Sequence, residues 1–203
     1  MKKHTLHLGV LLALVMLLVT MSVPAFAETG DVEIDAINFP DANFRAIVSF
    51  SDADKSNTLS ATEIAAVKTL ICYNKGIKDL TGIEHFTALT TLQCDYNELT
   101  ALDISKNTAL TNLSCVKNQL TVLDVSRNAD LKRLVCFGNK LTTLDVGNNT
   151  ALEALHCDSN ELTALDVSKN SVLKELGCAD NKLSSLDLRK IWNWLYWTAT
   201  ITG

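Results

Sequence analysis

The sequence has few of the residues and motifs on which catalysis and nucleic-acid binding depend. It contains no G-x-S-x-G nucleophile elbow, no H-E-x-x-H zinc motif and no phosphate-binding loop. Beyond residue 27 the only histidines are His85 and His156, which belong to different repeats. Acidic residues outnumber basic ones, 23 to 18, and no basic stripe is present, which argues against nucleic acid as a partner. We therefore predict a protein that is not an enzyme.

The first 27 residues have the organisation of a secretory signal peptide. Lys2 and Lys3 precede an apolar run over 8–19, and an A-x-A-like cleavage site ends at Ala27. The apolar run is interrupted and short for a membrane span, so we expect cleavage and no span in the mature chain. Cleavage removes two lysines and no acids, which leaves 16 basic and 23 acidic residues, a net charge of −7. The protein is therefore expected to be secreted or held at the cell surface.

A 21-residue repeat dominates the rest of the chain. A Leu-Asp pair recurs at this interval from Leu102 to Leu186, and cysteine recurs with the same period from Cys94 to Cys178. The segment from Leu89 to Leu99 reads L-x-x-L-x-C-x-x-N-x-L, and the same frame begins again four times. This period and this pattern are those of leucine-rich repeats, with cysteine in the third apolar position.

Each part of the repeat has a physical role. The L-x-C segment predicts a short strand whose leucine and cysteine point inward, and stacked strands then form a parallel sheet. Asparagines such as Asn97 follow each strand and can bond backbone groups that the stacking buries. The predicted fold is an α/β leucine-rich-repeat solenoid, with the sheet on its concave face and short turns on its convex side.

Six cysteines occupy the same inward position of successive repeats. Side chains in register on neighbouring parallel strands stay about 4.8 Å apart, beyond the roughly 3.8 Å that a disulfide prefers between Cβ atoms. Buried free cysteine behaves as a small hydrophobic residue. We therefore expect a column of core thiols rather than disulfides or a metal site.

The chain divides into four predicted segments: signal peptide 1–27, helical cap 28–68, solenoid 69–190 and C-terminal segment 191–203. Apolar residues at Phe44, Ile47, Val48 and Phe50 predict one short cap helix, and a second is predicted from Ile64, Val67 and Leu70. A solenoid needs such a cap to cover the open end of its core. The tryptophan-rich C-terminal segment is read either as a second cap or as a truncated end.

The helical cap, the L-x-C-x-x-N-x-L-T-x-L-D-V-S-x-N repeats and the longer entry coil from Leu70 to Phe86 resemble bacterial secreted leucine-rich-repeat proteins related to internalins. The resemblance covers nearly all of the mature chain. It implies an extracellular protein that binds other molecules, but a solenoid scaffold does not identify the partner.

The cap carries a segment that resembles an EF-hand calcium loop. Counted from Asp52 to Glu63, it has oxygen-bearing residues at loop positions 1, 3, 5, 7, 9 and 12. Asn57 stands where the motif has glycine, and asparagine tolerates the left-handed backbone needed there. A second interpretation needs no metal, because Ser60-x-x-Glu63 is also a helix capping box. The candidate calcium ligands are Asp52, Asp54, Ser56, Thr58, Ser60 and Glu63.

The aspartates that follow the repeat leucines, such as Asp103, are read as turn formers that accept backbone N–H groups two or three residues on. The outward-facing strand positions are more informative, because apolar Val116, Val135 and Phe137 fall together on the predicted concave face. A contiguous exposed apolar patch with a polar rim often marks a binding site, and aromatic residues and arginine dominate interfaces. The candidate partner-binding residues are Tyr73, Asp95, Tyr96, Val116, Arg133, Val135, Phe137, His156 and Asp158.

The sequence therefore predicts non-catalytic binding of a protein or cell-surface ligand, in adhesion or at a host or envelope surface. Two alternatives stay open. The solenoid can be a spacer or docking arm of a larger surface protein or enzyme, or a calcium-dependent structural module.

Overall fold

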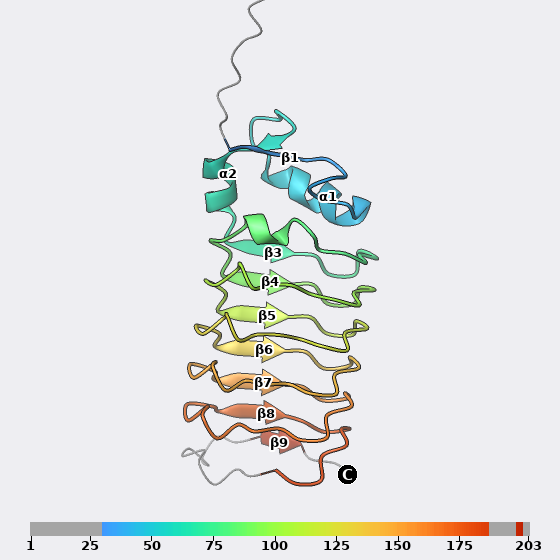
Figure 1. The fold of residues 1–203 in the computed structure, drawn as a ribbon, viewed down its shortest axis with the longest axis vertical. Coiled ribbons are helices and arrows are strands. Elements are labelled where there is room, and N and C mark those ends of the chain that lie inside the picture. Colours follow the sequence, from blue (N-terminus) through green and yellow to red (C-terminus); the bar gives the residue numbers. More distant parts are fainter. Residues whose placement is uncertain (1–29, 187–197, 201–203) are drawn as a thin grey trace, which may run out of the picture.

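The computed structural model describes residues 30–186 and 198–200 of the chain. These residues form an elongated stack of coils, closed at its N-terminal end by a helical cap (Figure 1). The predicted signal peptide and most of the tryptophan-rich segment lie outside the described residues. Within the described residues, none of the helices has the length and apolar character needed to cross a membrane.

The cap consists of two short helices and a two-stranded antiparallel sheet, formed by β1 (Val32–Glu33) and β2 (Thr58–Leu59). Helix α1 (Ala42–Val48) begins at Asp41, whose carboxylate accepts the N–H groups of residues 43 and 44. Helix α2 (Ala61–Ala66) begins with the predicted capping box of Ser60 and Glu63. Both helices are too short to be stable alone, so packing on the solenoid must hold them.

The predicted apolar faces of the cap helices are wrong in two places. Phe50 lies in the 3-10 turn η1 (Ser49–Ser51) and is 89% exposed. Helix α2 ends at Ala66, so Leu70 lies in the first strand of the solenoid and is buried there. The helix ends early because Val67 already has an extended backbone, with φ −74° and ψ 104°.

One parallel sheet runs the length of the solenoid and has seven strands in sequence order within the described residues. Each strand is three residues long, and its central residue is a buried leucine from β3 to β8. Strand register follows the repeat without slippage, so residue i pairs with residue i + 21 from β4 to β8. A 3-10 turn, η2 (Ile83–His85), lies in the longer first coil. The strands are β3 (Thr69–Ile71), β4 (Thr91–Gln93), β5 (Asn112–Ser114), β6 (Arg133–Val135), β7 (Ala154–His156), β8 (Glu175–Gly177) and β9 (Thr198–Thr200).

Leucine and cysteine fill the interior as the alternation predicts. All six cysteines are buried, and five of them have no exposed surface at all. Burial raises the pKa of the Cys72 thiol to about 12 and that of the Cys94 thiol well above its usual value. The inward position of the cysteines is confirmed, and each side chain is a neutral thiol at physiological pH.

The predicted role of the asparagine after each strand is confirmed. The Asn97 side-chain oxygen accepts the N–H groups of Lys75 and Ile77, both at 3.0 Å. Its amide nitrogen donates to the carbonyls of Cys72 and Cys94, at 2.7 and 3.0 Å. Each such asparagine therefore joins its own coil to the preceding one. Equivalent bonds recur at Asn118, Asn139, Asn160 and Asn181.

A second asparagine ladder, which the repeat pattern did not predict, lies on the other side of the coil. Its members are fully buried, and each amide nitrogen donates to carbonyls of the preceding coil. Asn149 donates to the carbonyls of Val125 and Asn128, at 2.9 and 2.8 Å. The side-chain oxygens of this ladder have no partner within the described residues. The ladder consists of Asn107, Asn128, Asn149 and Asn170.

The aspartates of the Leu-Asp pairs form the expected turns. Each carboxylate accepts a hydrogen bond from the N–H group two residues later; for example, the Ser105 N–H donates to the Asp103 carboxylate at 2.9 Å. This hydrogen bond, together with one from the Ser105 side chain, holds the pKa of Asp103 below its usual value. The turn-forming interpretation is confirmed for Asp103, Asp124, Asp145 and Asp166.

The thiol column makes a prediction about reactivity. Because burial keeps the thiols protonated, alkylation of the native protein at about pH 8 should be slow and should depend on unfolding. Denatured protein that has not been reduced should carry six alkyl groups by mass spectrometry; a disulfide between neighbouring coils would lower that number and contradict the prediction. Cys136→Ala should lower the free energy of unfolding by about 1–3 kcal/mol through a small cavity, and Cys136→Val by less.

The second asparagine ladder makes a prediction about stability and pH. Asn149→Ala removes two buried hydrogen bonds and should lower the free energy of unfolding by about 1–3 kcal/mol. Asn149→Asp should lower the free energy of unfolding by more than Asn149→Ala does at about pH 7, because a buried carboxylate has no hydrogen to donate to the two carbonyl oxygens that it would face.

Burial would raise the pKa of the introduced aspartate, so its extra cost should disappear as the pH falls below about 4, where it is protonated in both states. The exposed neighbour is the control, and Asn148→Ala should change stability by less than about 0.5 kcal/mol. Urea unfolding of each variant against the wild type at both pH values measures these differences. Equal costs for the alanine and aspartate variants at both pH values would contradict the prediction.

Candidate partner-binding surface

Strand alternation places three columns of side chains on the outer surface of the parallel sheet, here called the sheet face. The residues before and after each central leucine point outward, and so does the residue that follows each cysteine. The first column is Thr69, Thr91, Asn112, Arg133, Ala154 and Glu175. The second is Ile71, Gln93, Ser114, Val135, His156 and Gly177. The third is Tyr73, Asp95, Val116, Phe137, Asp158 and Ala179.

A hollow of about 520 Å³ lies on the sheet face over strands β4, β5 and β6. Six of the nine predicted partner-binding residues line it: Asp95, Tyr96, Val116, Arg133, Val135 and Phe137. Four polar residues outside the predicted set line it as well: Thr91, Gln93, Asn112 and Ser114. Two of these, Thr91 and Asn112, precede the central leucines, so the two-residue period of a strand was the signal that would have found them.

The expectation that Val116 and Val135 are exposed is wrong. They are 4% and 9% exposed, although neither belongs to the apolar core. Asp95 reaches across to the Val116 N–H and so lies over that residue. Val135 alternates with Arg133 and Phe137 along one segment of chain, and all three line the hollow. The two valines are the floor of the hollow, and Phe137 is half-buried in its wall.

Aromatic side chains form the rim of the hollow on the cap side. Tyr73 is 50% exposed and Tyr96 is 41% exposed, and their ring centroids lie 5.2 Å apart. The Lys117 ammonium group lies 5.3 Å from the centroid of the Tyr96 ring, which is a cation–π distance. Tyr96 and Lys117 both have left-handed backbones, with φ of 55° and 48°. Such a backbone costs a residue other than glycine about 1–2 kcal/mol, and the recurring turn before the buried asparagines imposes it here.

Two acidic residues of the predicted site accept hydrogen bonds from backbone N–H groups of the next coil. Asp95 accepts hydrogen bonds from the Ser114 hydroxyl at 2.6 Å and from the Val116 N–H at 2.7 Å. Asp158, three repeats further on, accepts the Ala179 N–H at 3.0 Å. Its carboxylate lies over Gly177, where a Cβ atom would stand 2.3 Å from a carboxylate oxygen. A side chain at position 177 would therefore need the Asp158 carboxylate to move, whereas three repeats earlier Asp95 accepts a hydrogen bond from Ser114 at the equivalent position.

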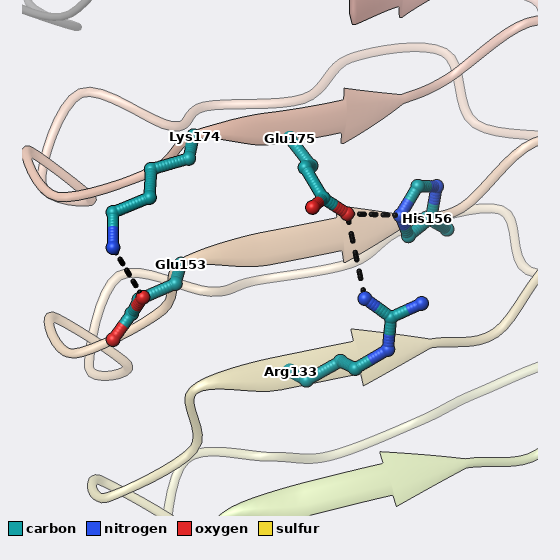
Figure 2. Close-up of polar contacts among 5 residues, drawn as sticks. All are labelled: Arg133, Glu153, His156, Lys174 and Glu175. Carbon is teal, nitrogen blue, oxygen red and sulfur yellow. Dashed lines mark hydrogen bonds and ion pairs between the residues drawn. The ribbon is translucent and has the colours of Figure 1, made fainter. Parts of the chain in front are cut away.

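The C-terminal half of the sheet face, here called the charged region, carries Arg133 on β6, His156 on β7 and Glu175 on β8. One carboxylate oxygen of Glu175 lies 3.2 Å from the His156 ring nitrogen Nε2 and 3.4 Å from the Arg133 guanidinium (Figure 2). These two neighbours, the His156 hydrogen bond first, hold the pKa of Glu175 below its usual value. His156 lies outside the large hollow, and Arg133 lines it, so Arg133 connects the hollow with the charged region.

The loop of the cap brings together three of its six predicted calcium ligands. One carboxylate oxygen each of Asp52, Asp54 and Glu63 lies within 4.8 Å of the others. Asn57 has a left-handed backbone with φ 64°, as the motif needs at that position. Glu63 also accepts the N–H groups of Ala53 and Ser60, so the same carboxylate closes the loop and caps α2.

The donor set of this loop suits a hard cation, because every candidate ligand is an oxygen. Hydrogen bonds, from Ser56 first for Asp54 and from Ser60 first for Glu63, hold the pKa of both carboxyls below the usual range. The hydroxyls of Ser56, Thr58 and Ser60 are hydrogen-bonded inside the loop. The geometry therefore accommodates both interpretations of the loop, and calcium binding stays a prediction.

Several known proteins are similar to this chain in sequence or in fold. No protein-family model matches the chain. Internalin J of Listeria monocytogenes is 45% identical to it over 70 residues, which are 34% of this chain and 8% of internalin J. The solved functional domain of internalin J, which includes a cysteine ladder, superposes with a TM-score of 0.72 at 37% identity. That superposition covers 85% of this chain and 44% of the internalin J domain.

The chain is an internalin-like leucine-rich-repeat protein. It is homologous to internalin J, and its column of six buried cysteines resembles the cysteine ladder for which that domain is described. It spans less than half of the solved domain and less than a tenth of full-length internalin J, so it corresponds to only part of that protein.

Two further structures share the fold of this internalin-like chain. The Listeria monocytogenes internalin inlF superposes with a TM-score of 0.61 over 85% of this chain and 60% of its own, at 21% identity, which shows the fold alone. A leucine-rich-repeat protein of Leptospira interrogans superposes with a TM-score of 0.54 at 28% identity, over 60% of this chain and 33% of its own.

Calcium binding in the cap loop can be tested by thermal melting. With a dissociation constant of about 1 mM, calcium at about 10 mM should stabilise the fold by about 1.4 kcal/mol and raise the melting temperature. Asp52→Ala should abolish this rise. Asp35→Ala is the matched control, because Asp35 forms a similar turn in the cap but lies outside the carboxylate cluster. An unchanged melting curve in the wild type would mean that the capping box accounts for the loop by itself.

Proposed function

We propose that this chain is a secreted or cell-surface protein that binds a protein ligand, without catalysis, through the hollow on its sheet face. The observation that carries the proposal is the hollow itself, because it combines an apolar floor, aromatic walls and polar groups on one rigid sheet. Anchor residues of protein interfaces are enriched in tyrosine, tryptophan and arginine and lie in such pockets. Homology to internalin J supports an interaction module, and the apolar run and cleavage site in the first 27 residues support secretion.

The backbone under the hollow is well suited to binding without rearrangement. Strands β4, β5 and β6 pair in register, and buried asparagine ladders fasten each coil to the next. A preformed surface loses little conformational entropy on binding, so more of the contact energy contributes to affinity. Phe137 has a central position among these features, because it is half-buried and contributes to the hollow without belonging to the core.

The exposed rim extends the surface toward the cap. Ile71, Tyr73 and Tyr96 are 59%, 50% and 41% exposed, and the two tyrosines contact each other. Exposed apolar side chains are ordinary when they are scattered, but here they adjoin the hollow and form a continuous surface with it. A partner that places an apolar side chain in the hollow would therefore cover the tyrosine rim at the same time.

The proposal predicts that Phe137→Ala separates binding from folding. Removing the ring creates no cavity in the core, so the melting temperature should change little. Partner affinity should fall by about 2 kcal/mol, or roughly thirtyfold, if Phe137 is a central anchor. The partner is first captured by a photoreactive phenylalanine analogue at position 137, identified by mass spectrometry, and then titrated against each variant.

Lys106 provides the matched control, because it is exposed and lines a different hollow with Asp79 and Asp103. The photoreactive group at position 106 should capture no partner, and Lys106→Ala should bind normally. Unfolding of the Phe137 variant would contradict its placement outside the core. Normal folding with undiminished binding would show that the partner uses another surface, as expected if the solenoid is a spacer.

A further inference from the structure

Three polar side chains from three successive coils converge on the sheet face next to the hollow. Figure 2 shows Arg133 and His156 pointing toward Glu175, with both dashed contacts ending on the same carboxylate oxygen. The guanidinium-to-oxygen distance is 3.4 Å and the His156 Nε2-to-oxygen distance is 3.2 Å. Two donors are therefore already arranged around the place that one carboxylate occupies.

The contact between Arg133 and Glu175 passes over an intervening strand. Arg133 pairs with Ala154 in the register of the sheet, and Ala154 pairs with Glu175, so the two charged residues are two strands apart. Two strand spacings are about 9.6 Å, which only long side chains can bridge. Alanine leaves the path open, and Ala154 is only 6% exposed although it is not in the core. The donors are thus held above the sheet, accessible to a partner.

The charge balance of this region favours the binding of an anionic group. A smaller hollow of about 270 Å³ is lined by the cations Lys132, Arg133 and Lys174 and by the carboxylates Glu153 and Glu175. Three positive charges against two negative ones give a surplus of +1, whereas the whole chain has a net charge of −5. Lys174 is paired with Glu153, and that pair is also drawn in Figure 2.

The internal contact of Glu175 is easily exchanged. The side chains of Arg133 and Glu175 are 49% and 48% exposed, and their distance of 3.4 Å is long for a charged hydrogen bond. Exposed ion pairs of this kind contribute little to stability. Arginine has five N–H donors in a planar fork, and a carboxylate that approaches from solvent can meet two of them in the stronger bidentate arrangement.

We propose that Arg133 and His156 form a recognition site for an acidic side chain of the protein partner, with Glu175 as an internal stand-in that the incoming carboxylate replaces. This inference rests on the proposed function, because Arg133 lines the large hollow together with Phe137. The partner segment then carries a glutamate or aspartate close to the apolar side chain that enters the hollow.

His156 contributes the second hydrogen-bond donor of this recognition site. Its Nε2 atom lies 3.2 Å from the same Glu175 carboxylate oxygen that the Arg133 guanidinium contacts at 3.4 Å. A partner carboxylate in the place of Glu175 can therefore accept hydrogen bonds from both side chains.

The test uses two fluorescein-labelled peptides, one with several glutamates around a single phenylalanine and one with glutamines in place of the glutamates. Fluorescence anisotropy with the intact mature protein should show about tenfold tighter binding of the glutamate peptide. Arg133→Gln should abolish this preference, and His156→Ala, which removes the second donor, should reduce it. Glu175→Gln should tighten glutamate-peptide binding severalfold, because the internal competitor loses its charge.

Lys182→Gln is the matched control, because Lys182 makes an ion pair with Glu161 across neighbouring coils but lies outside both hollows. This variant should bind like the wild type. Arg133→Lys keeps the charge without the planar fork, so it should retain only part of the preference. Circular dichroism of each variant checks the fold before binding is measured.

The inference is overturned if Glu175→Gln binds the glutamate peptide no better than the wild type, or if Arg133→Gln keeps the preference. Failure of both peptides to bind at millimolar concentration also overturns it. The proposed function is separable, because photocrosslinking at position 137 tests it without either peptide. Phe137→Ala should weaken both peptides equally and leave the ratio of their affinities unchanged.

Discussion

The structure depends first on hydrogen bonds made by buried asparagine side chains. At the corners of each 21-residue coil the backbone leaves the sheet, so its N–H and C=O groups cannot all pair with those of neighbouring strands. Backbone groups that are buried without a hydrogen-bond partner destabilise the fold. Asn97 supplies both an acceptor and a donor at one corner, and its equivalents do the same in later coils. Because each amide must reach the preceding coil, the ladders fix the distance and the register between coils.

The asparagine ladders also leave the sheet face free for other purposes. The backbone position of each outward residue is set by bonds on the inside, so Tyr96 and Lys117 keep left-handed backbones that neither side chain favours. The same rigid spacing lets Asp95 and Asp158 bond the next coil in the same manner. A face built this way can vary in chemistry from coil to coil while its geometry stays constant.

Most of the fold could be predicted from the sequence, because each feature depends on contacts that repeat every 21 residues. The inward cysteines, the bonds of Asn97 and the turn at Asp103 follow from local spacing and from the nearest coil. The end of helix α2 was placed too late, since apolar Leu70 fits a helix pattern as well as the strand that it enters.

The site was less predictable because it depends on how side chains from several coils cover one another. The alternation of the strand correctly predicted that Val116 points outward. It did not predict that the Asp95 carboxylate accepts the Val116 N–H and covers that residue. Similarly, the ion pair of Arg133 and Glu175 spans 42 residues, two repeats rather than one, and depends on the small size of Ala154 between them. How far one side chain covers its neighbours depends on the lengths of the individual side chains, and the repeat pattern does not specify these lengths.

The uniform 21-residue coil has a consequence for how this protein can change over evolutionary time. A gene segment encoding one whole coil can be duplicated or lost by recombination without breaking either asparagine ladder, since every junction is equivalent to the one it replaces. An event of this kind between the cap and β6 moves the charged region relative to the cap by one strand spacing, about 4.8 Å. The reach of the molecule can therefore be adjusted in fixed steps, while point mutations on the sheet face adjust which ligand it accepts.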